Sequence, residues 1–220
     1  MAKIRDFTSG LIHCIGSSLS LAGLVLLIIW AALSGDAYDI VSFSLFGSSL
    51  FLLYLFSTLY HWLNLGPKGM SVFRKFDNIM IYIFIASSYT VICLGPLRGP
   101  WGWSLFGVIW GLAVLGIILS AIWTKVPKAL TNSIYFTMGW LILIGISPLI
   151  QVYKNAGLLY SLWLLVISGI IYTISGILYI LKIPKNKLFI HFGSHEILHL
   201  SILLGSIFEY WFIFKYITIF

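Results

Sequence analysis

Seven long apolar runs, separated by short breaks rich in Gly, Pro and Lys, dominate this sequence. Hydrophobic residues make up 60% of the chain and charged residues 9%, whereas roughly a quarter of the residues in a soluble domain are charged. A run of about 20 apolar residues can cross a bilayer as a helix. The runs lie near residues 11–33, 42–63, 76–95, 101–123, 131–150, 158–181 and 190–214. We therefore expect an all-α, polytopic membrane protein, a seven-transmembrane-helix bundle that forms a single domain over residues 1–220.

The basic residues predict the orientation of this bundle. Ten of the thirteen Lys and Arg residues precede the first run or lie in the second, fourth and sixth connections. Because such residues stay on the cytoplasmic side, we expect a cytoplasmic N-terminus and a C-terminus outside. The first apolar run, of about 20 residues, exceeds the 7–15 of a signal-peptide core, which favours a membrane helix. The net charge of +7 then reflects loops near anionic lipid, not a nucleic-acid partner.

Small residues at helical spacing predict close contacts between helices. Gly16-x-x-x-Ser20 lies in the first run and Gly107-x-x-x-Gly111 in the fourth. Such pairs let neighbouring helices approach closely in a membrane. We interpret both as packing within the chain.

Three of the five histidines and one aspartate fall near the predicted cytoplasmic ends of different helices. His61 ends the second run and Asp77 opens the third. His195 and His199 have i, i+4 spacing, which places two imidazoles on one helix face. Three neutral nitrogens leave a fourth position for water, as in catalytic zinc sites. Asp77 would bond that water or ligate directly, and Ser57, one turn before His61, would reach the water or a substrate oxygen.

Structural roles for the same residues must be weighed against this site. A histidine in a bundle can simply bond a neighbouring helix, and Asp77 follows Arg74 and Lys75, with which it could pair. The Ser57 hydroxyl could be satisfied by the carbonyl four residues earlier. Ionisable groups within a membrane are costly and usually functional, which favours the metal site.

The remaining histidines and acids are expected to lie outside the site. We predict that His13 and His191 lie at the interface, where water satisfies them, and that Glu196 points away from His195 toward a cytoplasmic lysine. Glu209, Asp36 and Asp39 are expected on the outer side.

Several stretches of the chain resemble the haemolysin III family, which is related to the progestin and adipoQ receptors and more distantly to alkaline ceramidases. They are Ser57-Thr-Leu-Tyr-His61, Lys75-Phe-Asp77, Ala86-Ser-Ser-Tyr-Thr90, Gly99-Pro-Trp-Gly-Trp103 and Gly193-Ser-His-Glu-Ile-Leu-His199. The resemblance implies a zinc ion (Zn2+) held by His61, His195 and His199, with Asp77 reaching it directly or through water.

The resemblance also implies an activity, because related members cleave the amide of ceramides. Zinc-bound water would attack the carbonyl, Asp77 would shuttle the proton, and Ser57 would steady the developing charge. We therefore expect a zinc-dependent hydrolase of lipid amides or esters, with membrane lipids as partners, in a bacterial plasma membrane. The alternative is a cytolytic, pore-forming or signalling membrane protein with a structural zinc. Transport is disfavoured because paired Gly/Pro breaks at mid-membrane are not evident.

Overall fold

The structure, a computed structural model, describes residues 5–123, 126–184 and 193–220. Residues outside these ranges include His191 and four of the lysines used to predict orientation: Lys3, Lys125, Lys185 and Lys187. Within the described ranges every regular element is a helix.

The prediction of seven membrane-spanning segments is confirmed. Four are single helices: α1 (Phe7–Ser34), α2 (Ala37–Trp62), α3 (Pro67–Leu94) and α4 (Pro100–Ile122). The fifth combines α5 (Lys128–Trp140), a 3₁₀ turn (Leu141–Gly145) and α6 (Ile146–Asn155). The sixth is a 3₁₀ turn (Leu159–Ser161) followed by α7 (Leu162–Leu181), and the seventh is α8 (Ser194–Phe212) followed by a π turn (Ile213–Ile217).

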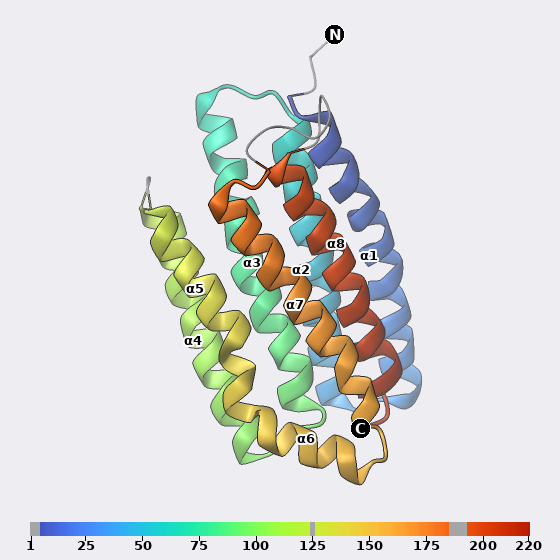
Figure 1. The fold of residues 1–220 in the computed structure, drawn as a ribbon. Helices are drawn as coiled ribbons and strands as arrows, with labels where there is room; N and C mark the ends of the chain where they lie inside the picture. The colour runs from blue at the N-terminus through green and yellow to red at the C-terminus, as the bar shows by residue number, and fades with distance from the viewer. Residues whose placement is uncertain (1–4, 124–125, 185–192) are drawn as a thin grey trace.

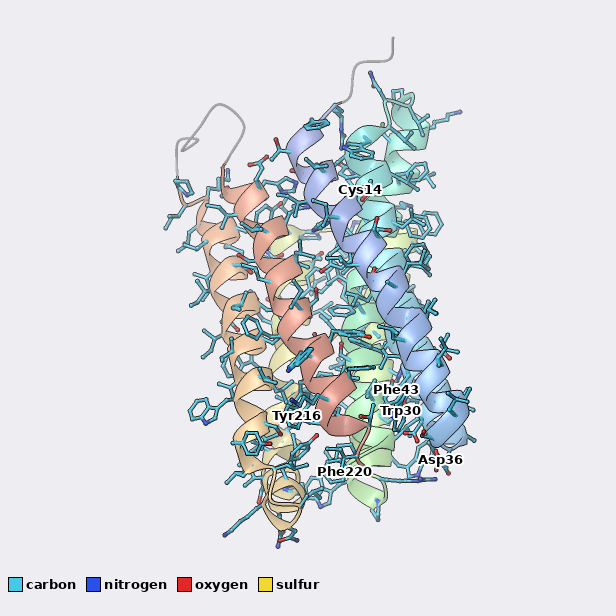
Figure 2. The ribbon with its side chains drawn as sticks, turned by 90° about the vertical axis from the view of Figure 1, so that its right-hand side faces the viewer. Cys14, Trp30, Asp36, Phe43, Tyr216 and Phe220 are labelled. Carbon is cyan, nitrogen blue, oxygen red and sulfur yellow. The ribbon has the colours of Figure 1, made fainter. Side chains whose placement is uncertain are left out.

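The helices pack mainly against their neighbours in sequence, and α8 closes the bundle beside α1 (Figure 1). Of the seven segments, α3 is the most enclosed and α7 the least. Helix α1 begins at the end of the bundle opposite to Asp36, Tyr216 and Phe220 (Figure 2). We call the end that carries His61 and His195 the histidine end.

Helix α3 begins nine residues before the predicted start at residue 76. Pro67 occupies its first turn, where the missing N–H has no intrahelical partner to lose. Lys68, Arg74 and Lys75 therefore lie on a helix and not in a loop, and Asp77 lies in about the third turn instead of opening the helix. These polar turns extend α3 in the N-terminal direction, beyond the apolar run from which its start was predicted.

The fifth span is broken, which the prediction of one run over 131–150 missed. Helix α5 has 13 residues and the 3₁₀ turn has 5, so together they reach about 30 Å, the thickness of the bilayer core. Helix α6 then runs across the end of the bundle opposite to the histidine end (Figure 1). Pro148 lies in its first turn, where proline is tolerated.

The two small-residue motifs have different environments. A Cβ built on Gly16 would lie 2.9 Å from the ring of Tyr54, so α1 and α2 do pack closely there. No described atom lies within 4 Å of a Cβ built on Gly107 or Gly111. The prediction that this second motif packs within the chain is therefore wrong.

An ion pair joins two connections at the end opposite to the histidine end. Nη1 of Arg98 lies 2.6 Å from Oδ2 of Asp36, and the guanidinium stacks 3.7 Å above the ring of Tyr38. The hydrogen bond from Arg98 lowers the pKa of the Asp36 carboxyl below its usual range. Asp36 also caps α2 by accepting from the amides of Tyr38 and Asp39.

Candidate metal centre

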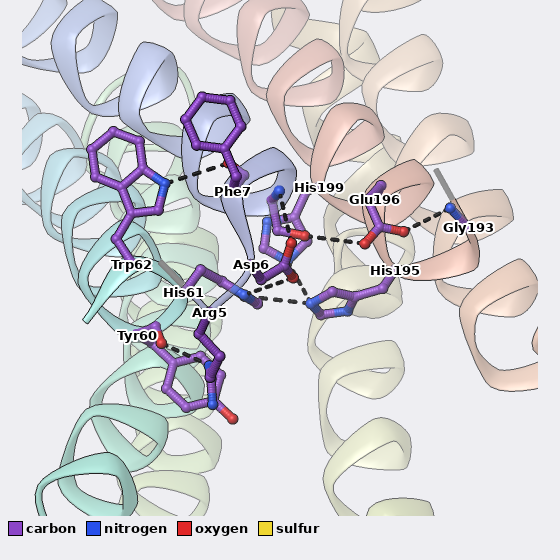
Figure 3. A network of polar contacts seen from close by, with 11 residues as sticks. Arg5, Asp6, Phe7, Tyr60, His61, Trp62, Gly193, His195, Glu196 and His199 are labelled. Atoms are coloured by element: carbon purple, nitrogen blue, oxygen red, sulfur yellow. Dashed lines mark hydrogen bonds and ion pairs between the residues drawn. The ribbon is translucent and has the colours of Figure 1, made fainter. Parts of the chain in front are cut away.

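Three imidazoles from two helices converge at the histidine end (Figure 3). His61 comes from the last turn of α2, and His195 and His199 from the first turns of α8. One ring nitrogen from each lies within 4.8 Å of the others. His61 and His199 are buried, whereas His195 is half-buried. The i, i+4 spacing on α8 and the contact of α1 with both α2 and α8 bring the three rings together.

The separations between these nitrogens fit ligands of one metal ion. Nε2 of His195 lies 3.3 Å from Nε2 of His61 and 3.1 Å from Nε2 of His199. Two nitrogens bound to zinc at 2.0–2.1 Å in tetrahedral geometry would be about 3.3–3.4 Å apart. In all three rings Nε2 is the nitrogen that faces the other imidazoles, so one cation could accept the lone pairs of the three Nε2 atoms. The described residues therefore form a group that could hold a metal ion.

Asp6 supports His61 from the first helix, and sequence reasoning missed it. Oδ2 of Asp6 lies 3.2 Å from Nδ1 of His61, an ion-pair distance without hydrogen-bond alignment. A carboxylate at Nδ1 favours a proton there and leaves the Nε2 lone pair free for a metal. The signal in the sequence was an aspartate directly before an apolar run, which is typical of a helix N-cap. Asp6 is indeed the N-cap of α1.

The segment around Asp6 is bonded to the end of α2 (Figure 3). The amide of Asp6 donates to the carbonyl of His61 at 3.1 Å. The Arg5 guanidinium donates to the carbonyl of Tyr60 at 2.8 Å, and the Trp62 indole donates to the carbonyl of Phe7 at 3.4 Å. These bonds hold the Asp6 carboxylate beside His61.

His13 and Glu196 differ from their predicted positions. His13 is only 3% exposed, and its ring lies 3.9 Å from that of His199, centroid to centroid. Neither ring nitrogen of His13 has a hydrogen-bond partner among the described residues. Glu196 is buried, accepting from the Ser9 hydroxyl at 3.4 Å and the Gly193 amide at 2.7 Å. The predictions failed because α1 packs against α2 and α8: the His13 ring contacts those of Tyr54 and His199, and Ser9 of α1 contacts Glu196.

Asp77 and Ser57 lie beside each other, outside the histidine group. The Ser57 hydroxyl neighbours the Asp77 carboxyl, so α2 and α3 bring together the two residues predicted for catalysis. Ser57 is buried and Asp77 is half-buried. The group of metal-binding atoms that lie within 4.8 Å of one another contains no Asp77 oxygen.

A second buried polar group lies farther along α8. Glu209 is 7% exposed and accepts a 3.0 Å hydrogen bond from the Tyr172 hydroxyl of α7. The Tyr54 hydroxyl of α2 bonds Ser206, one turn before Glu209. The predicted placement of Glu209 away from the site agrees with its distance along α8, about 15 Å from His199. Its burial inside the bundle was not foreseen.

Replacing Asp6 with asparagine should weaken metal binding. We expect a 10–100-fold loss of affinity for zinc, because partners that orient a ligating histidine typically contribute that much. Asparagine still caps α1, so the helix should persist. Competition against a chromophoric chelator measures the change. Asp36→Asn, at the other N-cap aspartate, is the matched control, and equal affinities of the two variants would contradict the role of Asp6.

Comparisons with known proteins agree with this architecture. Residues 1–210 match the model of the family described as Haemolysin-III related. The chain is 40% identical over 202 residues to the hemolysin-3 homolog of Bacillus subtilis (strain 168), which covers 92% of this chain and 89% of the relative. It is 38% identical over 203 residues to hemolysin-3 of Bacillus cereus, covering 92% and 87%.

A more distant relative occurs in animals. The human monocyte to macrophage differentiation factor is 27% identical over 193 residues, covering 84% of this chain and 74% of the relative. Seven apolar helices and bacterial relatives of nearly the same extent indicate a multi-pass protein of the bacterial plasma membrane. Because the family model spans almost the whole bundle, the chain belongs to the haemolysin-III-related family of integral membrane proteins.

Proposed function

We propose that this protein is a zinc-dependent hydrolase that cleaves amide or ester bonds of membrane lipids. The observation that carries the proposal is the convergence of three Nε2 atoms at separations of 3.1 and 3.3 Å. Sites with three protein ligands and an open position are typical of catalytic zinc, whereas structural zinc sites have four protein ligands. The excess of basic residues at this end of the bundle supports a cytoplasmic location for the site.

In this proposal His61, His195 and His199 hold the ion. Zinc bound there would supply a Lewis acid that polarises a carbonyl and activates water near neutral pH. Asp6 keeps the Nδ1 proton on His61, so that Nε2 stays available as a ligand. Half-exposed His195 marks the side from which a lipid carbonyl would approach, since the other two rings are buried.

We assign proton transfer to Asp77 and stabilisation of the oxyanion to Ser57. Asp77 lies outside the close histidine group, which supports a role as general base and acid rather than as a ligand. The Ser57 hydroxyl lies beside Asp77 and, one turn from His61 on α2, can donate a hydrogen bond to a developing negative charge.

A lipid-hydrolysis screen tests this function. Purified protein with stoichiometric zinc is incubated with ceramides and with other lipid amides and esters in mixed micelles. We expect zinc-dependent release of fatty acid. Asp77→Asn should lower turnover at least about 100-fold, the lower range for general acid–base catalysis, while its zinc content stays at the wild-type level. Zinc-loaded wild-type protein that cleaves none of these lipids would contradict the proposal.

The name hemolysin-3, carried by a relative that is 38% identical, favours a second candidate function, cytolysis with a structural zinc. Liposome leakage caused by pure protein and retained in His195→Ala would support it. Leakage that is absent at high protein dose would remove it.

A further inference from the structure

A small polar pocket lies beside the candidate metal centre and belongs to neither the zinc ligands nor the proposed catalytic pair. Its volume is about 170 Å³, and its lining is Arg5, Tyr60, Pro67, Met70, Ser71 and Arg74. At about 30 Å³ per water molecule, this space equals five or six waters. It is too small for a drug-sized ligand but has room for a phosphate group.

The pocket concentrates positive charge. Arg5, Arg74 and Arg98 are the three arginines of the chain, and the first two line this pocket. Arg98 is paired with Asp36, whereas neither Arg5 nor Arg74 forms a salt bridge within the described part of the chain. No acidic residue is among those that line the pocket. Guanidinium groups bind phosphate by paired, charge-assisted hydrogen bonds, so the lining favours such an anion.

The two arginines are arranged for one ligand. The Arg5 guanidinium is fixed by its bond to the Tyr60 carbonyl at 2.8 Å and lies 4.2 Å above the Tyr60 ring. On α3, Ser71 and Arg74 have i, i+3 spacing, so they share one face. Lys75, the next residue, is turned away and donates to the Ala121 carbonyl at 2.6 Å. The charge in the pocket therefore comes from specific side chains rather than from a generally basic helix end.

We propose that Arg5 and Arg74 form a phosphate-binding site, with the Ser71 hydroxyl as an additional donor. The ligand is a phosphate group, either of an anionic lipid headgroup or of a soluble phosphate. The site adjoins the metal centre through the chain itself, because Arg5 precedes Asp6 and Tyr60 precedes His61. This inference does not depend on hydrolysis or on bound metal.

Thermal unfolding of the full chain in uncharged detergent tests the site. Three probes are titrated: inorganic phosphate, a short-chain phosphatidic acid, and a phosphatidylcholine with the same chains. Metal is first removed with a chelator, so that no probe binds through it. Because a ligand of the native state raises the unfolding temperature, each variant serves as its own reference. We expect phosphatidic acid to raise the midpoint of the wild type and phosphatidylcholine to leave it unchanged.

The variants distinguish this pocket from general attraction to positive charge. Arg74→Gln should require about tenfold more phosphatidic acid for the same rise, in line with the loss of charge-assisted hydrogen bonds. Lys75→Gln removes the same charge from the neighbouring position and should respond like the wild type. Arg5→Lys keeps the charge but loses the planar fork, and should also weaken binding.

The probes also identify the source of the phosphate. A response to inorganic phosphate as well shows that the phosphate group is sufficient, and a response to phosphatidic acid alone assigns the site to a membrane lipid. The proposal is overturned if the wild type responds to neither, or if it responds equally to phosphatidylcholine. It is also overturned if Arg74→Gln and Lys75→Gln respond alike. None of these outcomes depends on lipid cleavage.

Discussion

His195→Ala should abolish stoichiometric zinc binding. Replacing a residue that only orients a ligand costs 10–100-fold in metal affinity, so loss of one of three ligands should cost more than about 100-fold. His195 occupies the middle of the cluster, with its Nε2 within 3.3 Å of both other rings. Its removal leaves only the Nε2 atoms of His61 and His199, without the imidazole that contacts both. Elemental analysis of purified protein and competition with a chelator measure the loss.

His13→Gln provides the matched control for that experiment. It removes an imidazole that lies against His199 but has no nitrogen in the converging group. We expect this variant to retain zinc, with a loss of affinity below about tenfold because the orienting contact at His61 stays intact. A His195→Ala protein with wild-type zinc content would overturn the site assignment.

Gly102→Ala should be the most destabilising single-methyl change in the bundle. The added Cβ would lie 2.2 Å from the carbonyl oxygen of Cys93 and 2.6 Å from that of Leu97. Both contacts are with backbone, which cannot rotate away as a side chain can. We expect a loss of about 3 kcal/mol, the upper range for overpacking. This corresponds to a fall of roughly 6–12 °C in the unfolding midpoint for a chain of this length.

Gly107→Ala and Gly111→Ala test the same substitution on the same helix without the clash. No described atom lies within 4 Å of either added Cβ. Alanine also favours a helix over glycine by about 0.5–1 kcal/mol, so the two variants should unfold at or slightly above the wild-type midpoint. A Gly102→Ala protein as stable as these two would show that the turn between α3 and α4 can relax.

Hydrophobic runs alone were enough to predict the seven spans, because the bilayer sets the length of each one. They were not enough for the start of α3, since its first turns carry Lys68 and Arg74 and continue past the apolar run. The break after Trp140 was also invisible, because the 3₁₀ turn Leu141–Gly145 contains only Leu, Ile and Gly and so reads as part of the apolar run. An apolar stretch of this kind is expected in a membrane span whether its backbone is α-helical or 3₁₀, so hydrophobicity does not distinguish the two.

At the site, spacing within a helix was sufficient to pair His195 with His199, and charge placed His61 at the same end. The contribution of α1 could not be predicted in this way. Burial of His13 and the approach of Asp6 to His61 depend on which helices are neighbours. Neighbour relations in a bundle arise from tertiary packing, which periodicity in one segment does not encode. The roles of Asp77, Ser57 and zinc stay predictions.

The candidate metal centre combines an imidazole of α2 with two of α8, helices that are far apart in the sequence, and this has a consequence for biosynthesis. His61 precedes His195 by 134 residues, so His195 and His199 are synthesised only after the six preceding spans. A nascent chain halted before α8 has one of the three converging imidazoles and cannot assemble the cluster. An ion that needs all three imidazoles could therefore bind only after α8 has joined the bundle.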